Sequence, residues 1–209
     1  VINKVDLVSA DQIETLRDFF AREFPDVDVL EIAARGREGM DPWFMSMLEG
    51  EMDAARVLEI DYDQYGDGEA LLGWLNGTVR FEAPDEVDGN AILRDLAAGI
   101  AASLERRGAE VAHLKMTLTP IGDPFEIAAI NLVRGGADAE QSHRLSEALE
   151  DGELLLNLRA EAAPDLLDSA ADEALAEVLG RRFALDYRVD HLEHFRPGQP
   201  VPTHRVAAV

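Results

Sequence analysis

Apolar and polar positions along the first 50 residues predict two strands and two helices. Residues 1–8 are mostly apolar and predict a buried strand, and Ser9 with Gln12 forms the capping box of a helix start. The apolar side chains of that helix lie three and four positions apart, and they are Ile13, Leu16, Phe19 and Phe20. Residues 27–32 predict a second strand, and Asp41-Pro42 opens a second helix. The order strand–helix–strand–helix is typical of a doubly wound α/β sheet.

The pattern changes after residues 51–69, an acidic stretch that we interpret as a linker. Beyond it, residues 70–194 predict an α+β domain of the ferredoxin-like sandwich type, with an antiparallel or mixed sheet and helices on one face. The expected elements, in order, are strand 71–82, helix 90–107, a hairpin of strands 111–119 and 125–134, helix 139–150, strand 153–161, helix 164–182 and strand 183–190. Residues 195–209 carry three prolines and predict an irregular tail.

Composition narrows the classes of function. The formal net charge of −23 argues against nucleic acid as a partner, because no basic stripe is present to displace counterions from phosphates. No apolar run is long enough to span a membrane, and no signal-peptide pattern opens the chain, so we expect a cytoplasmic protein without a membrane partner. The chain has no cysteine, which excludes disulfides and thiolate metal sites. It begins with Val1 in an apolar strand, from which we expect it to be cut from a longer protein.

The most specific motif is Asn3-Lys4-Val5-Asp6, placed between the first predicted strand and the first helix. In P-loop GTPases an N-K-x-D sequence at this place reads guanine. The Asp6 carboxylate could accept hydrogen bonds from the ring N1–H and the 2-amino group, which adenine lacks, so adenine would leave the carboxylate desolvated and unpaired. The alternative interpretation is a polar turn after an edge strand.

A second loop of the kind found in P-loop GTPases follows the next predicted strand. The predicted strand 27–32 ends in Ala33-Ala34-Arg35-Gly36, where such GTPases carry a short Ser-Ala-(Lys/Arg) loop whose backbone N–H faces the guanine oxygen. Ala33 replaces the serine of that pattern. Because the contact to guanine is made by the backbone, we expect the replacement to affect the stiffness of the loop more than the contact.

Together, V-I-N-K-V-D-L-V and A-A-R-G-R-E-G-M-D resemble the CobW-like branch of the GTPases that serve metal-cofactor assembly, over about residues 1–50. The resemblance implies that these residues are an α/β remnant of a P-loop GTPase sheet, truncated before the NKxD motif. It also implies GTP hydrolysis with Mg²⁺, a metallochaperone or cobalamin-assembly role, a missing N-terminal GTPase half as partner, and a metalloprotein client. A Walker A sequence needs Gly-Lys followed by Ser or Thr, and the chain has none, so GTP phosphates and Mg²⁺ would be held by residues outside it and no catalytic residue is assigned.

Three weaker patterns suggest metal ligands, but each has a simpler interpretation, and no metal site is assigned. Residues 61–69 start like a calcium loop and lack its closing Glu, so we interpret them as acidic linker. Four methionines, Met40, Met45, Met47 and Met52, fit helix packing better than a soft-metal site. His191 and His194 lie three positions apart with no third ligand nearby, which favours a surface pair.

A polar sheet face stands out in the second domain. Period-2 alternation places Asn76, His113, Lys115 and Arg159 on one face, and the opposite face would carry Ala112, Leu114, Met116, Leu154, Leu156 and Leu158. The face is either merely solvated or a docking or ligand surface, and Lys115, one of only two lysines, is the side chain expected to meet an acidic group or a ligand. The alternative function is therefore a non-catalytic binding module whose GTPase strands are vestigial.

Overall fold

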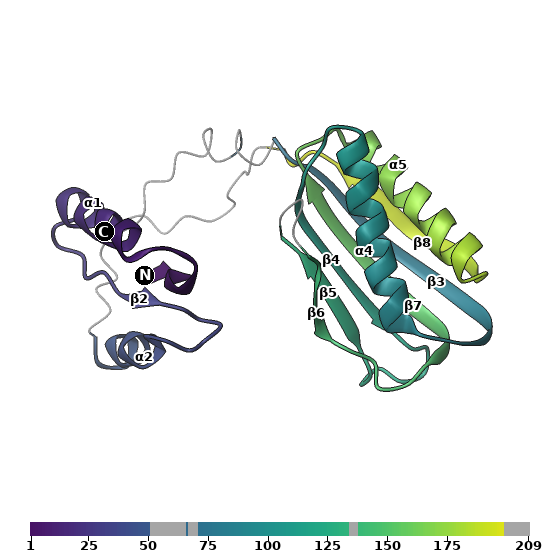
Figure 1. Cartoon of the computed structure of the whole chain (residues 1–209), viewed down its shortest axis with the longest axis horizontal. Helices are drawn as coiled ribbons and strands as arrows, with labels where there is room; N and C mark the ends of the chain where they lie inside the picture. Colours follow the sequence, from purple (N-terminus) through teal and green to yellow (C-terminus); the bar gives the residue numbers. More distant parts are fainter. Residues whose placement is uncertain (51–65, 67–70, 134–137, 199–209) are drawn as a thin grey trace, which may run out of the picture. The chain divides into compact units, whose positions relative to one another are not determined.

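The computed structural model describes residues 1–50, 66, 71–133 and 138–198 (Figure 1). The predicted linker, apart from Gly66, and residues 199–209 of the predicted tail lie outside the described residues. The described chain falls into two compact units, one holding residues 1–50 and the other residues 71–133 and 138–198. Within these ranges no helix has the length and apolar character needed to cross a membrane.

The first unit is a short parallel sheet with two helices. Its elements are β1 (Ile2–Asn3), a 3-10 turn (Val5–Leu7), α1 (Ala10–Glu23), β2 (Glu31–Ile32) and α2 (Met40–Glu49). β1 and β2 pair in parallel, with Ile2 opposite Glu31 and Asn3 opposite Ile32. The capping box is confirmed, because the Ser9 side chain accepts from the Gln12 N–H and the Gln12 side chain accepts from the Ser9 N–H.

Both strands are shorter than the sequence predicts. The expected strand 1–8 stops after Asn3, because Lys4 has a left-handed backbone (φ 65°) that turns the chain into the 3-10 helix. The expected strand 27–32 is reduced to Glu31–Ile32. Neither helix of this unit contains a buried residue, and Phe19, Phe44 and Leu48 are exposed. Parallel sheets are normally covered on both faces. The exposed apolar side chains of this unit are therefore a surface that further strands or helices could cover.

The second unit is an antiparallel sheet with helices on one face. Its elements are β3 (Gly73–Val87), α4 (Gly89–Arg106), β4 (Val111–Thr119), β5 (Ala128–Leu132), β6 (Glu140–His143), β7 (Leu149–Ala160), α5 (Pro164–Leu175), a π-helical turn (Ala176–Arg182) and β8 (Asp186–Phe195). The strand order is β6-β5-β4-β7-β3-β8, and every neighbouring pair is antiparallel. α4 and α5 lie side by side against the same face of the sheet (Figure 1).

The core of this unit lies between the sheet and the two helices. Alternate residues of β3, β4 and β7 are buried there, among them Leu75, Leu114 and Leu156, and α4 contributes Ile92, Leu96 and Ile100. No described helix of this unit covers the other face of the sheet, which agrees with the period-2 pattern. The predicted inward position of Ala112 is wrong, because a register shift between Val111 and His113 leaves Ala112 exposed and buries Val111 instead.

The predicted helix 139–150 is also wrong. Residues 140–143 form the edge strand β6, and β7 begins at Leu149, four residues earlier than expected. The Asn90 side chain explains the extended backbone: its amide donates to the Leu145 carbonyl and its oxygen accepts from the Leu145 N–H, both at 3.0 Å. Leu145 and Leu149 are buried four residues apart, a spacing that imitates a helix, although Leu145 lies in the loop before β7 and Leu149 begins that strand.

At the C-terminal end, helix 164–182 is present, with a π-helical second part, and the last strand lies at 186–195 instead of 183–190. A polar clamp joins this helix to α4. The buried Ser103 hydroxyl donates to Glu173 Oε2 at 2.7 Å, and Arg106 and Arg107 form ion pairs with the same carboxylate.

This clamp predicts an acid-sensitive contribution to stability. The hydrogen bond from Ser103, followed by that from Arg107, lowers the pKa of Glu173 below its ordinary value. A depressed carboxylate pKa adds stability above the unfolded-state pKa, and that stability is lost as the pH falls through the folded-state pKa. We therefore expect Glu173→Gln to destabilise the second unit at pH 7, and the difference from wild type to shrink below about pH 4.

Urea unfolding measured from pH 7 to pH 3 checks this expectation. Glu105→Gln, at an exposed position of α4, removes the same charge without touching the clamp and serves as the control. A Glu173→Gln difference that stays constant over this pH range contradicts the assignment of the depressed pKa.

Candidate functional site

Two loops of the first unit come together at the ends of β1 and β2. Because these strands are parallel neighbours, the residues that follow them leave the sheet at the same edge. The Asn3 side chain joins the loops: its Oδ1 accepts from the Lys4 N–H at 2.7 Å and from the Ala34 N–H at 3.2 Å. The two sequence motifs, joined through residues that lie 31 positions apart in the chain, therefore form one local structure.

The second loop is closed by its own backbone. The Ala33 N–H donates to the Glu38 carbonyl at 3.0 Å, and Ala33 is buried, so a methyl side chain fits where a serine hydroxyl would need a partner. Gly39 follows with a left-handed backbone (φ 69°) directly against β2, where a Cβ atom would lie 2.1 Å from the Glu31 carbonyl oxygen. Ala34 and Arg35 are exposed at the tip.

Asp6 is exposed on the 3-10 turn, and its carboxylate has no hydrogen-bond or ion-pair partner among the described residues. An unpaired carboxylate beside a tethered loop can accept two donors of a planar base. Lys4, two residues before Asp6 in the chain, is exposed as well. Asn3, Lys4, Asp6, Ala33, Ala34 and Arg35, the predicted guanine contacts, thus all belong to two loops that one hydrogen bond connects.

The open face of the second unit is a grid of cross-strand rows. One row contains Asn76 of β3, Asn157 of β7, Lys115 of β4 and Asn131 of β5, each directly opposite the next. The adjacent row consists of Trp74, Arg159 and His113 on β3, β7 and β4. Directly opposite residues have Cβ atoms only about 4.5–5.5 Å apart, so the four residues predicted for the docking face, Asn76, His113, Lys115 and Arg159, do lie together.

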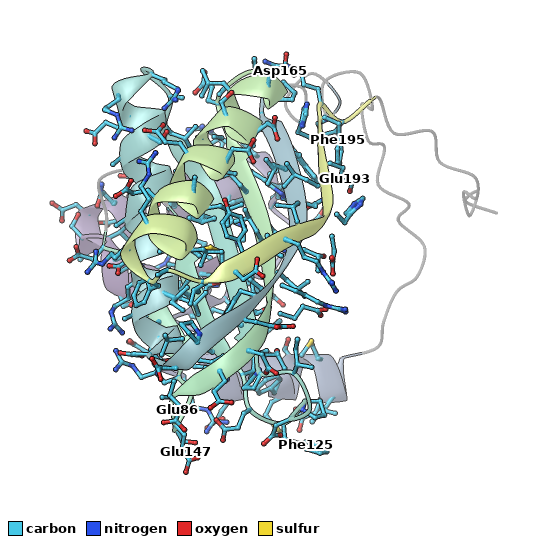
Figure 2. The ribbon with its side chains drawn as sticks, turned by 90° about the vertical axis from the view of Figure 1, so that its right-hand side faces the viewer. Glu86, Phe125, Glu147, Asp165, Glu193 and Phe195 are labelled. Atoms are coloured by element: carbon cyan, nitrogen blue, oxygen red, sulfur yellow. The ribbon has the colours of Figure 1, made fainter. Side chains whose placement is uncertain are left out.

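These residues line a shallow depression of about 380 Å³, with Leu155 and Thr117 at the next row. The Arg159 guanidinium stacks over the Trp74 ring, 3.7 Å from its centroid. Burial, followed by the positive charges of Arg159 and Lys115, lowers the pKa of His113. The Trp74 row lies beside Phe195, which is opposite Trp74 on β8, at the end of the sheet that carries Asp165; Phe125 and Glu147 lie at the other end (Figure 2).

Three features of this face escaped the sequence. The register places Asn131 beside Lys115, whereas its neighbours in the chain do not decide its side of the strand. Leu155 lies outward between the buried Leu154 and Leu156, as the same alternation implies, but as a leucine it does not belong to the polar residues by which the sequence marks this face. Trp74 supports Arg159 from the neighbouring strand, and only the pairing of β3 with β7 reveals this contact.

The weaker metal patterns are placed as follows. Residues 61–69, apart from Gly66, lie outside the described residues, and so does Met52. The other three methionines of the cluster, Met40, Met45 and Met47, belong to α2. His194 approaches Asp165 and Asp168, and His191 lies 3.9 Å from Glu193. Among the described residues, no group of three or more His, Asp or Glu side chains has an arrangement that could hold a metal ion.

Comparison with known proteins gives no family. No family model matches the chain, and no curated protein and no solved structure is significantly similar to it. The interpretation of both sites therefore depends on their own geometry and chemistry.

Proposed function

We propose that residues 1–50 supply the guanine-recognition loops of a P-loop GTPase of the CobW-like type, a GTP-dependent metallochaperone or cobalamin-assembly protein. The observation that carries the proposal is the hydrogen bond from the Ala34 N–H to Asn3 Oδ1. A guanine site of this kind needs the Asp of one loop and a backbone N–H of the next to face the same base. The tie between Asn3 and Ala34 supports that arrangement, and it leaves the Asp6 carboxylate unpaired among the described residues.

Asp6 would accept from guanine N1–H and the 2-amino group, the Lys4 stem would lie over the base plane, and the Ala34–Arg35 backbone would face the guanine oxygen. GTP phosphates and Mg²⁺ find no ligands of the required kind here, since Lys4 follows Asn and Lys115 follows Leu rather than the Gly of a Walker A loop. Hydrolysis would therefore rest on residues outside these 209, in an N-terminal GTPase half.

The exposed apolar surface of the first unit supports the same proposal. Two parallel strands of two residues each, flanked by helices without buried residues, are an incomplete layer. A P-loop GTPase sheet would cover Phe19 and Phe44 with neighbouring strands and helices. In the cytoplasm, where we place the protein, such a surface needs a covering partner.

For the second unit we infer a ferredoxin-like sandwich. Within the order β6-β5-β4-β7-β3-β8, the elements β3-α4-β4 and β7-α5-β8 form two split β-α-β halves that interleave. The hairpin strands β5 and β6 extend the sheet beside β4. In a metal-cofactor GTPase this domain is where a metalloprotein client would be engaged.

The guanine proposal can be tested on the 209-residue chain by measuring which nucleotide base it prefers, and whether Asp6→Asn changes that preference. We expect GTP to bind the 209-residue chain with a Kd above about 1 mM, because contacts to phosphates and Mg²⁺ dominate affinity in P-loop proteins. Amide shifts on titration of the ¹⁵N-labelled chain should centre on residues 3–6 and 33–35 for GTP and be absent for ATP. Asp6→Asn should transfer these shifts from GTP to XTP, whose 2-oxo group accepts the new amide donor, with guanine affinity falling by about 2–4 kcal/mol.

Asp11→Asn is the matched control, since it makes the same change at an exposed position of α1. This variant should keep the preference of the wild type. Equal shifts with GTP and ATP, or an Asp6→Asn chain that still prefers GTP over XTP by the original margin, would show that these loops do not read the base.

A second candidate function is a non-catalytic binding module, with the GTPase strands vestigial. It is favoured by the cationic depression on the open sheet face, where Lys115 and Arg159 have no carboxylate partner among the described residues, although the chain has 42 acidic residues and a net charge of −23. The two candidates are compatible, because they use different units of the chain.

A further inference from the structure

The positive side chains of the second unit divide into two groups. Most arginines are neutralised by a nearby carboxylate: Arg80 by Glu153 and Asp190, Arg106 by Glu173, and Arg182 by Asp95. On the open face, the Lys115 ammonium has no hydrogen bond or ion pair with any described residue, and Arg159 contacts only the Trp74 ring face. Two exposed cations side by side, neither with an ion-pair partner among the described residues, are unexpected in a chain of net charge −23.

Two carboxylates lie on the Lys115 row, Glu140 of β6 opposite Asn131 and Glu193 of β8 opposite Asn76, and Lys115 forms no ion pair with either. Glu193 of β8 accepts from the Asn76 amide at 2.9 Å. It lies three strands away from Lys115, which at the usual strand spacing is about 14 Å. That separation exceeds the Debye length of about 8–10 Å at moderate salt, so Glu193 does little to neutralise Lys115. Glu140 lies two strands away on the other side, about 10 Å at the usual spacing, so it neutralises Lys115 only in part.

Donor groups converge on the depression between these cations. The Asn157 amide and the Thr117 hydroxyl have no hydrogen-bond partner among the described residues, and both line the depression with Lys115 and Arg159. Arg159 keeps its planar guanidinium fork, held by stacking on Trp74, in a geometry suited to two oxygens of one anion. His113 also lines the depression, and no Asp or Glu is among the described residues that line it.

The order of side chains along the strands gives the site a direction. Outward positions on β7 are Leu155, Asn157 and Arg159, and those on β4 are Thr117, Lys115 and His113. One end of the depression is therefore cationic and the other presents Leu155, which is 42% exposed. An anion that carries an apolar group next to its charged group would match both ends.

We propose that this depression binds a compact organic anion, a phosphate or carboxylate attached to a small apolar body. Its charged group lies between Lys115 and Arg159, and its apolar body covers Leu155. The volume of about 380 Å³ is in the range of small-ligand sites. An extended polyanion fits less well, because beyond the depression it would meet Glu193, Glu153 and Asp190. The inference does not depend on guanine binding by the other unit.

Phenyl phosphate, benzoate and inorganic phosphate test the proposal, with phenol as the neutral control. We expect the two organic anions to shift the amides of residues 113–117 and 155–159 in the ¹⁵N-labelled chain, and to raise the pKa of His113 by adding a negative charge beside it. Inorganic phosphate should bind at least 5-fold more weakly than phenyl phosphate, and phenol should not bind. Whichever of phenyl phosphate and benzoate binds with the lower Kd shows whether the site prefers a phosphate or a carboxylate.

Variants assign the contacts. Lys115→Ala and Arg159→Ala should each weaken phenyl phosphate at least 10-fold, and Lys115→Gln, which keeps most of the stem, should weaken it as much. Leu155→Ala should weaken phenyl phosphate while leaving inorganic phosphate within 2-fold. Arg144→Ala removes an exposed arginine elsewhere in the unit and should change nothing.

Unchanged melting temperatures would show that these variants still fold. The proposal is overturned if no anion shifts these residues at 20 mM, if Arg144→Ala weakens binding as much as Lys115→Ala, or if a hexaglutamate peptide binds the face more tightly than phenyl phosphate. The last result would make the face a docking surface for an acidic protein segment.

Discussion

Replacing Leu156 by Ala is expected to destabilise the second unit by about 2–5 kcal/mol, while the same change at the adjacent Leu155 costs less than about 1 kcal/mol. Leu156 is 1% exposed and belongs to the core between the sheet and the helices. It pairs with Gly77 on one side and Met116 on the other, and Gly77 itself has no side chain that could fill the cavity.

Urea unfolding followed by circular dichroism measures both variants. Leu155 faces the open side of the same strand, so it is a matched control in residue type and backbone position. The large difference should appear in the midpoint, with little change in the slope, because the surface exposed on unfolding stays nearly the same. Similar losses at the two positions would contradict the assignment of inner and outer faces of β7.

Gly39→Ala is expected to open the loop that follows β2. A Cβ atom at this position would lie 2.1 Å from the Glu31 carbonyl oxygen, which is backbone and cannot rotate away. The left-handed backbone adds about 1–2 kcal/mol for a residue other than glycine. In a unit with so few buried residues, these costs together should break the Ala33–Glu38 pairing.

Hydrogen exchange at the Ala33 amide reports this pairing, because that N–H donates to the Glu38 carbonyl. We expect exchange at least 10-fold faster in Gly39→Ala, with a loss of the guanine shifts at residues 33–35. Gly36→Ala is the control in the same loop, since a Cβ atom there would meet no atom closer than 3.9 Å. Protection of Ala33 that survives in Gly39→Ala would show that the loop tolerates the change by rearranging.

Local signals account for much of what the sequence predicted well. The capping box of Ser9 and Gln12, and the alternation that separates Leu75 and Val79 from Asn76 and Thr78, each depend on residues a few positions apart. Such elements predicted a sheet with helices on one face, antiparallel or mixed and with five strands; the sixth strand, β6, and the fully antiparallel order come from the structure. The co-location of Asn76, His113, Lys115 and Arg159 also followed, because outward positions of neighbouring antiparallel strands share a face.

The misplaced elements have long-range causes. Residues 139–150 have helical spacing, but the Asn90 side chain, 55 residues earlier, pairs with the Leu145 backbone and β5 pairs with β6. A single inserted residue at Ala112 changes which side chain of β4 is buried, and alternation cannot show where a bulge falls. The short β1 results from the left-handed Lys4 backbone, a conformation that propensity does not favour for lysine.

Residue identity and spacing alone specified the charge, the absence of cysteine, the two loop motifs and the faces of the long strands, because these are properties of the chain or of its immediate neighbours. Tertiary structure alone decided which strands are neighbours, and therefore that Arg159 stacks on Trp74, that Asn131 joins the Lys115 row and that Asn3 ties to Ala34. The physical reason is that pairing between distant strands is chosen by the burial of the whole sheet face, to which every strand contributes at once.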